Sequence, residues 1–221
     1  MKVSEALKAR KSVRAFTEQT VSDQQITQIL DAARWAPSGV NTQPWSVAVL
    51  RGQAKQQLQQ KLEAAFRAGE PSSQEYQYYP KEWQEPYRSR RKECGLLMYS
   101  VLGIKKEDKE RRQDQWAANY RAFDAPVMLL FFMDGIMQAG SYMDYGMFIQ
   151  SVMLAAMEQG LGTCPQAALA EYPAIVKSEL GYSESSVLLC GMSLGYEDKQ
   201  ALVNSYRTPR EKVESFTRFF S

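Results

Sequence analysis

The chain has 221 residues, of which 44% are hydrophobic, so it is long enough for one domain with a sizeable core. Its 27 basic and 25 acidic residues leave a net charge of +2, which gives no general case for nucleic-acid binding. The chain contains no histidine, which excludes Ser-His-Asp and Cys-His catalysis and the usual histidine-bearing metal sites. Any enzymatic chemistry is therefore expected to belong to a bound cofactor.

The first third of the chain predicts two helices, a strand and a third helix. Residues 2–10 carry apolar side chains on one helical face, and a basic turn, KSVRAF, follows them. Ser22, with Gln25 three residues later, predicts the start of the second helix, which ends at Pro37. The pattern then predicts a buried strand and a polar helix with a glycine stop: 46–50, 53–68 and Gly69.

The remainder predicts helices alternating with strands, which favours an α+β fold. Helical patterns and buried strands alternate in this order: helices 93–102 and 107–122, strand 125–132, helix 141–160, strand 186–196. The long helix over 141–160 is apolar nearly all round, which indicates that a partner chain covers part of it. The last 20 residues read as a charged, extended segment.

Cysteine usage and the apolar runs point to a cytoplasmic protein. Three widely spaced cysteines, Cys94, Cys164 and Cys190, argue against both a disulfide framework and a zinc site. The longest apolar runs, such as 127–133, fall short of the roughly 20 residues that span a bilayer, and the N-terminus lacks a signal-peptide pattern. We expect one domain over residues 1–221 that binds no membrane, no metal and no nucleic acid.

Residues 70–92 differ in composition from the rest of the chain. Aromatic side chains alternate there with Pro, Ser, Glu and Arg, and neither the helical nor the strand period fits. A long aromatic loop in a compact domain is typical of a lid over a ligand, but it is equally typical of a segment that packs on a neighbouring subunit. The candidates for contact with a substrate are Tyr76, Tyr79, Trp83 and Tyr87.

Basic side chains gather near both ends of the chain. The motif ARKSVRAF places Arg10, Lys11, Ser12 and Arg14 at a helix end, and YRTPR places Arg207 and Arg210 after the last strand; together they could clamp one phosphate. Each cluster alone also fits an ordinary solvated segment.

Two further segments are rich in small residues and exposed backbone. RWAPSGVNTQPW (34–45) follows a helix, and QGLGTCPQAAL (159–169) turns sharply at Gly160 and Gly162. Because Gly160 and Gly162 turn the chain and Pro165 fixes φ, the backbone N–H groups that follow could face a flat ligand. The segment matches neither a Walker loop nor a Rossmann fingerprint. Cys164 in this segment reads as a small buried thiol rather than a nucleophile, because no histidine can activate it.

The ordered set of motifs A-R-K-S-V-R-x-F, A-x-W-A-P-S-G-x-N-x-Q-P-W, Q-G-L-G-T-C-P-Q and a late R-x-x-R resembles the FMN-dependent nitroreductase family over essentially the whole chain. The insertion at 70–92 and the G-T-C-P-Q segment look most like its nitrobenzoate-reductase branch. The resemblance implies a three-layer α+β sandwich around a mixed, mainly antiparallel sheet. It also implies an intertwined homodimer with two FMN molecules at its interface. The C-terminal extension 200–221 of each chain would reach the partner subunit.

The resemblance further implies roles for individual residues. The N-terminal motif and the late arginines would bind the FMN phosphate, ribityl chain and pyrimidine edge, and one loop would come from the second subunit. Arg14 would balance the charge of the reduced flavin. By segment, the implied cofactor-binding residues are Arg10, Lys11, Ser12 and Arg14; Pro37, Ser38, Gly39, Asn41 and Gln43 of the second subunit; Asn119; Pro165, Gln166, Ala167 and Ala168; and Arg207 and Arg210.

The implied activity is a ping-pong reduction of nitroaromatic compounds by NADH or NADPH, with no catalytic side chain because the flavin carries the chemistry. The rivals are reductive dehalogenation, quinone reduction or flavin reduction on the same fold, or a non-catalytic flavin sensor. A deiodinase-like Glu-Tyr-Lys set is suggested by Glu75, Tyr76 and Lys81, but the spacing does not match.

Overall fold

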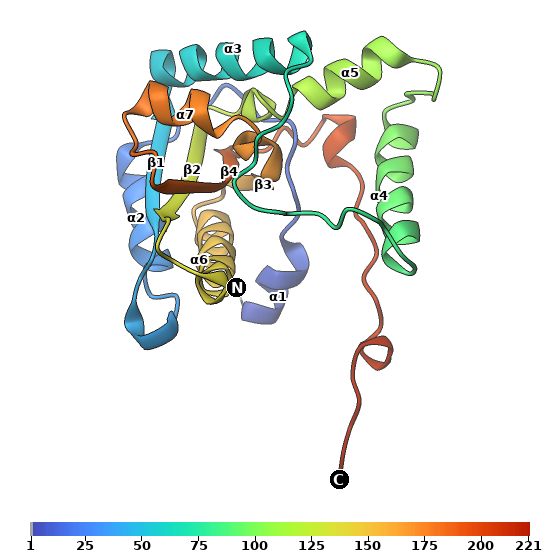
Figure 1. Cartoon of the computed structure of the whole chain (residues 1–221). Helices are drawn as coiled ribbons and strands as arrows, with labels where there is room; N and C mark the ends of the chain where they lie inside the picture. Colours follow the sequence, from blue (N-terminus) through green and yellow to red (C-terminus); the bar gives the residue numbers. More distant parts are fainter. Residues whose placement is uncertain (1) are drawn as a thin grey trace.

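The computed structural model describes residues 2–221 and has an α+β architecture (Figure 1). Its α-helices are α1 (Val3–Ala9), α2 (Asp23–Ala33), α3 (Gly52–Ala68), α4 (Tyr87–Val101), α5 (Lys109–Ala117), α6 (Ala139–Glu158) and α7 (Pro173–Leu180). Its strands are β1 (Ser46–Arg51), β2 (Val127–Asp134), β3 (Gly162–Gln166) and β4 (Ser186–Gly195), and short 3-10 turns include η1 (Gly39–Asn41), η3 (Ala167–Ala170) and η4 (Leu202–Asn204).

The four strands form one sheet in the order β1-β2-β4-β3, and all three pairings are antiparallel. An isolated β-bridge between Ser12 and Thr163 is parallel, and it places the N-terminal basic motif beside the edge strand β3. Gly162 makes this close approach feasible, since a Cβ there would lie 2.7 Å from Cγ2 of Val13. The N-terminal motif is therefore fixed to the sheet and does not hang free.

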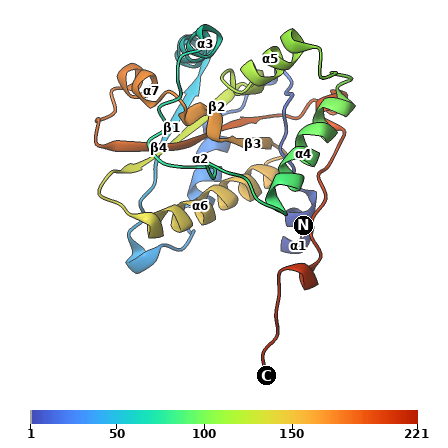
Figure 2. The same cartoon turned by 45° about the vertical axis from the view of Figure 1, so that its right-hand side comes forward.

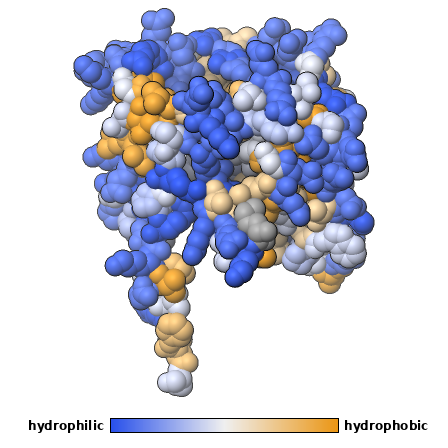
Figure 3. Space-filling model, turned by 180° about the vertical axis from the view of Figure 1, so that it is seen from behind, coloured by the Kyte–Doolittle hydropathy of each residue, from blue (hydrophilic) through white to orange (hydrophobic). Residues whose placement is uncertain are grey.

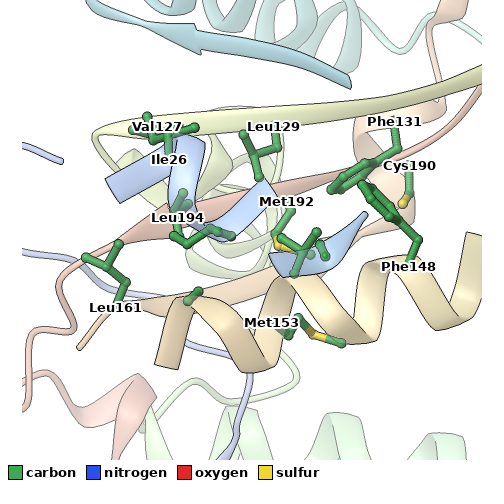
Figure 4. Packing of buried hydrophobic residues seen from close by; sticks show 14 of the residues in the cluster. Ile26, Val127, Leu129, Phe131, Phe148, Met153, Leu161, Cys190, Met192 and Leu194 are labelled. Atoms are coloured by element: carbon green, nitrogen blue, oxygen red, sulfur yellow. The ribbon is translucent and has the colours of Figure 1, made fainter. Parts of the chain in front are cut away.

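Strand β2 is buried on both faces and divides the core into two clusters. Val127, Leu129 and Phe131 face α2 and α6, whereas Met128 and Leu130 face α3, η3 and α7. The first cluster is shown in Figure 4, where Phe148 and Met153 of α6 pack against the strand side chains. Helices on both faces of the sheet make the three layers that the resemblance implies.

Several helix ends follow the predicted chemistry. The Ser22 hydroxyl accepts a hydrogen bond from the Gln25 backbone N–H at 3.2 Å, and the Gln25 side chain accepts one from the Ser22 N–H at 3.1 Å. Gly69 ends α3 with φ of 72°. The predicted strands and the long helix are likewise confirmed, with ends displaced by up to two residues.

Two expectations were wrong. The segment from Gly162 to Gln166 is an edge strand rather than a turn, and Pro165 fits there because an edge position does not require its missing N–H. The insertion is not a loop throughout, because α4 already begins at Tyr87. The many Arg residues of its first turns hid the helical period. The short helix α7, which the sequence pattern did not predict, begins at Pro173.

The C-terminal segment leaves the body of the molecule after η4 and descends as an extended tail (Figures 1 and 2). Apolar side chains lie along this projection in Figure 3, and Phe216, Phe219 and Phe220 are 71%, 91% and 90% exposed. Large aromatic side chains this exposed normally mark an interaction surface. Among residues 2–221, no helix is long and apolar enough to cross a bilayer.

Candidate functional site

Three guanidinium groups meet where the two ends of the chain come together. Arg207 donates hydrogen bonds to the backbone carbonyls of Lys8, Ala9 and Arg10 at 2.5, 2.8 and 2.6 Å, which ties the tail to the end of α1. Burial and the nearby charges of Arg210 and Arg207 hold the pKa of the Arg10 guanidinium below its usual range. Within residues 2–221, no carboxylate lies within 4 Å of these three guanidinium groups. The cluster therefore carries uncompensated positive charge, which suits an anion such as a phosphate.

Lys11, which the sequence grouped with these arginines, points elsewhere. Its ammonium lies 2.6 Å from a carboxylate oxygen of Glu197 and 2.6 Å from the backbone oxygen of Asn204. It lines a separate hollow of about 410 Å³ together with Arg10 and Thr17. A direct contact between the Lys11 side chain and a phosphate is therefore not supported, since its charge is already paired.

A cavity of about 670 Å³ lies between the edge strand β3 and the helices α4 and α5. A cavity of this size falls in the range typical of small-molecule and cofactor sites. The residues predicted to bind a cofactor that line it are Arg14, Asn119, Pro165, Gln166, Ala167 and Ala168. The Cys164 thiol also lines it, and Arg14, four residues after Arg10 in the N-terminal motif, links this cavity to the arginine cluster; Arg10 itself lines the separate hollow of about 410 Å³.

Arg14 is held in the cavity wall by both its backbone and its side chain. Its N–H donates to the Asn204 side-chain oxygen at 2.8 Å, and its guanidinium lies 3.4 Å from the Tyr206 hydroxyl and over the Phe123 ring at 6.0 Å. Asn204 is 2% exposed, so this contact anchors the basic motif to the C-terminal segment. The guanidinium is thereby placed as a fixed cation beside whatever occupies the cavity.

Gln166 supports the cavity wall rather than offering its side chain to it. Its amide oxygen accepts from Ser193 at 2.5 Å, its amide nitrogen donates to the Asn119 backbone oxygen at 2.9 Å, and only 4% of the residue is exposed. The link joins β3, β4 and the end of α5, so it fixes Asn119 at the cavity. Any ligand contact from this stretch is expected to come from the backbone.

Cys164 behaves as the sequence predicts for a structural thiol. It is 3% exposed, and burial raises the pKa of its Sγ in spite of the nearby charges of Arg14 and Arg10. A neutral, buried thiol is a poor nucleophile. Within residues 2–221, no group of three or more Cys, Asp or Glu side chains is arranged to hold a metal ion.

The four aromatic residues of the insertion do not act together. Tyr79 lines the cavity, and Trp83 packs against it with ring centroids 5.6 Å apart. Tyr76 instead packs against the core, where its hydroxyl donates to the Leu189 backbone oxygen at 2.5 Å, and it is not among the residues that line the cavity. Tyr87 is 60% exposed at the start of α4.

The segment before Tyr79 is held against the body by polar contacts. The Gln74 amide donates to the Ala167 backbone oxygen at 3.2 Å, and the Ser73 N–H donates to the Glu171 backbone oxygen at 2.9 Å. Glu75 forms an ion pair with Lys177 and accepts from the Leu188 N–H at 2.8 Å. Glu75 is therefore a structural residue, and the deiodinase-like interpretation has no geometric basis.

The loop with Pro37, Ser38, Gly39, Asn41 and Gln43 lies on the opposite side of the molecule from the tail and α4 in both ribbon views (Figures 1 and 2). Its Ser38 hydroxyl accepts from the Gln43 N–H at 3.0 Å, and the Gly39 N–H donates to Asp144 of α6 at 3.2 Å. Asn41 and Gln43 have φ of 61° and 47°, so the loop keeps a shape that most residues avoid. Within one chain, the loop cannot share a ligand with the arginine cluster.

The sequence missed a set of cavity-lining side chains on α4, α5 and the end of η3. They are Arg88, Arg91, Lys92, Arg112, Trp116 and Glu171. The spacing of Arg88, Arg91 and Lys92 at i, i+3 and i+4 would have placed them on one helical face, but this signal was lost because the first turns of α4, residues 87–92, were assigned to the loop.

Glu171 gives the cavity a pH-dependent group. Burial raises the pKa of this carboxyl, although the Tyr120 hydroxyl, 2.5 Å away, hydrogen-bonds to it. The pKa of this carboxyl is higher in the folded state than in the unfolded state. Below the unfolded pKa the group is protonated in both states and does not change the free energy of unfolding. As the pH rises through the folded pKa, ionisation favours the unfolded state and the free energy of unfolding falls. We expect Glu171→Gln to gain unfolding free energy relative to wild type as the pH rises above the ordinary Glu pKa of about 4.3, measured by urea denaturation at several pH values from there to neutrality. A constant difference across this range would contradict the assignment.

Comparison with known families identifies this arrangement. Residues 7–196 match the model of the nitroreductase family. The chain belongs to the nitroreductase family. A 4-nitrobenzoate reductase from Pseudomonas putida is 41% identical over 211 residues, which cover 96% of this chain and 92% of that protein. A nitrobenzene nitroreductase from Ectopseudomonas oleovorans is 34% identical and covers 98% of this chain and 96% of that protein.

Solved structures of nitroreductases share the whole fold. The FMN and NADPH-dependent nitroreductase NfnB from Sphigopyxis sp. strain HMH superposes with a TM-score of 0.97 at 39% identity, with complete coverage of both chains. The FMN-dependent nitroreductase NfnB from Mycobacterium smegmatis, solved in complex with NADPH, gives a TM-score of 0.93 at 33% identity and covers 99% of this chain and 97% of that one. The predicted family and the predicted α+β fold are therefore confirmed.

Proposed function

We propose that the protein is an FMN-dependent NAD(P)H nitroreductase that reduces nitroaromatic compounds. The observation that carries the proposal is the cluster of Arg10, Arg207 and Arg210, which has no carboxylate within 4 Å in the described part of the chain, beside a cavity of about 670 Å³ whose wall holds Arg14 of the same motif. An uncompensated cluster of three guanidinium groups fits a phosphate, and the cavity beside it fits a flat ring system. The relatives named above are nitroreductases, and two of the solved ones are described as FMN-dependent.

The chain's own residues would hold FMN as follows. Arg10, Arg207 and Arg210 would bind the phosphate, and Ser12 and Asn119 would face the ribityl chain and pyrimidine edge. The backbone from Pro165 to Ala168 would lie along the ring. Arg14, fixed by Asn204, would supply positive charge at the ring edge that becomes electron-rich on reduction. When bound, FMN accepts a hydride from NAD(P)H and passes it to the nitro compound.

Each of the two reduction steps transfers two electrons from one NAD(P)H. One NAD(P)H and one proton convert the nitro group to a nitroso group with release of water, and a second NAD(P)H and proton convert the nitroso group to a hydroxylamine. The donor and the acceptor use the same cavity in turn, which predicts ping-pong kinetics. The cavity walls would shield the ring from water and would position both reactants against it; no side chain needs to form a covalent bond.

A homodimer would complete the site. The loop Pro37–Gln43 lies far from the arginine cluster of its own chain, so a second chain is needed to bring the two together. Exposed apolar side chains on α6, Met143 and Met147, and on the tail, Phe216 and Phe219, supply surfaces that a partner would cover. The tail beyond residue 200 would reach across to the partner, and residues 1–221 would act as one domain of a cytoplasmic enzyme.

The proposal is tested with the purified protein reconstituted with FMN. We expect the absorption maxima of an oxidised flavin, their bleaching by NADPH or NADH under anaerobic conditions, and recovery on addition of 4-nitrobenzoate or nitrobenzene. Product analysis should show the hydroxylamine. A protein that takes up no FMN, or a bound flavin that neither coenzyme reduces, would overturn the proposal.

The two-chain site predicts a specific effect at Ser38. Ser38→Asp keeps an oxygen that can accept from the Gln43 N–H, but it adds a negative charge next to the proposed flavin position in the partner. We expect weaker FMN binding, by roughly tenfold, with an unchanged thermal midpoint of the apoprotein. Thr42→Asp places the same charge four residues away in the exposed loop and serves as the control. Unchanged FMN affinity of Ser38→Asp would argue against this position for the loop.

A further inference from the structure

One wall of the large cavity is basic in a way that the proposed FMN site does not use. Arg88, Arg91 and Lys92 of α4 line the cavity together with Arg112 of α5. On α4 they occupy positions i, i+3 and i+4, so they project from one face of the helix. We call Arg88, Arg91, Lys92 and Arg112 the basic wall.

The charges of the basic wall are nearly unpaired within residues 2–221. Arg88 has a carboxylate oxygen of Glu85 at 3.8 Å, and no carboxylate lies within 4 Å of the other three. Among the described residues that line the cavity, the one acidic side chain is Glu171, which accepts a hydrogen bond from the Tyr120 hydroxyl and lies more than 4 Å from all four cationic groups. Ordinary surface arginines find carboxylate neighbours, as Arg90 does on another face of α4, 3.0 Å from Glu211.

Aromatic rings hold two of these guanidinium groups in position. Arg91 lies over the Trp83 ring at 5.0 Å, and Arg112 lies over the Tyr99 ring at 5.0 Å. A guanidinium stacked on a ring keeps its N–H groups at the edge, where they can donate to an anion in the same plane. The Arg112 contact with the Lys106 backbone oxygen, at 3.3 Å, occupies one nitrogen and leaves the others.

We propose that the basic wall binds an anionic group, a carboxylate or a phosphate, on a reactant held in the cavity. This inference rests on the proposed function, since it names which substrates of that reaction the site prefers. Two sources share the chemistry: the carboxylate of a nitrobenzoate-type acceptor, and the additional phosphate that distinguishes NADPH from NADH. Planar, bidentate arginine contacts suit both groups.

The experiment compares Arg91→Gln and Arg112→Gln with wild type in steady-state kinetics. One arm measures kcat/KM for 4-nitrobenzoate and for its neutral methyl ester with a saturating coenzyme. The other arm measures kcat/KM for NADPH and for NADH with a saturating neutral acceptor. For at least one of the more anionic compounds, 4-nitrobenzoate or NADPH, we expect kcat/KM to fall about tenfold through a higher KM with unchanged kcat. This is the effect that removal of one charge-assisted contact implies.

Arg90→Gln is the matched control, because it removes the same charge from the same helix without touching the cavity. A selective loss in the carboxylate arm identifies the acceptor as the anion, and a selective loss in the coenzyme arm identifies the phosphate. Two ratios of kcat/KM decide the outcome: 4-nitrobenzoate to its methyl ester, and NADPH to NADH. The proposal is overturned if both ratios stay at their wild-type values in Arg91→Gln and Arg112→Gln, or if Arg90→Gln changes them as much.

Failure of the proposed function would look different. In that case the wild-type protein would hold no FMN or would not reduce the neutral ester at all. Flavin content and turnover of the methyl ester, measured for each variant, separate the two outcomes, since both should remain at wild-type level when only anion binding is lost.

Discussion

Replacing Arg10 by methionine should lower the affinity for FMN about 10- to 100-fold and leave the apoprotein at least as stable as wild type. The loss follows from removing one charge-assisted phosphate contact, worth about 1.5–3 kcal/mol. Burial of the Arg10 guanidinium and its repulsion by Arg210 and Arg207 hold its pKa below the usual range. Methionine removes both unfavourable effects, so the apoprotein should not lose stability. Fluorescence titration of FMN and urea unfolding of the apoprotein measure the two quantities separately.

Lys8→Met is the control for this experiment. Lys8 lies two residues before Arg10, in the last turn of α1, and contributes only its backbone oxygen to Arg207, so its side-chain charge should matter little. Equal losses of FMN affinity in the two variants would mean that general positive charge, and not the cluster, binds the phosphate. A marked loss of apoprotein stability in Arg10→Met would show that its guanidinium has a structural partner.

Replacing Glu75 by alanine should destabilise the fold by about 3 kcal/mol. The substitution leaves the Lys177 ammonium, on a residue 3% exposed, with only the Glu184 backbone oxygen, and it leaves the Leu188 N–H without its acceptor. Breaking a buried ion pair typically costs about 3–5 kcal/mol, and the lower end applies because the Glu75 side chain is 22% exposed. Urea denaturation measures the change.

A double-mutant cycle tests the cause of this loss. Adding Lys177→Met to Glu75→Ala should recover part of the stability, because no buried charge is then left unpaired. Glu179→Ala, which removes a more exposed ion pair with Lys61, should cost less than about 1 kcal/mol. No recovery in the double variant would show that Glu75 acts through its bond to the Leu188 N–H alone.

The fold was largely predictable because its signals are local. The capping pair Ser22 and Gln25, the stop at Gly69 and the apolar run of β2 each depend on a few neighbouring residues. The strand at 162–166 was missed because its proline and glycines are typical of turns, and only the pairing with β4 makes it a strand. The start of α4 was missed because its first turns are charged on most sides and bury no residue.

The candidate site was predictable where two motifs carry the same kind of charge, and not where a residue distant in the sequence competes for a side chain. The Arg10 and Arg207 motifs come together as expected across nearly the full length of the chain. Lys11 did not join them, because Glu197, which nothing in the N-terminal motif reveals, pairs with its ammonium. Gln166 likewise serves Ser193 and Asn119, partners that only the folded sheet brings within reach.

The contact between Arg207 and the end of α1 also bears on when the protein can acquire its cofactor. Arg207 and the Arg10 backbone oxygen to which it donates are 197 positions apart, so a ribosome adds the second arginine about 10–40 s after the first. During that interval the nascent chain has only one side of the phosphate clamp. FMN loading should therefore follow translation of nearly the whole domain, and ribosome-stalled chains that end before Arg207 should not retain the flavin.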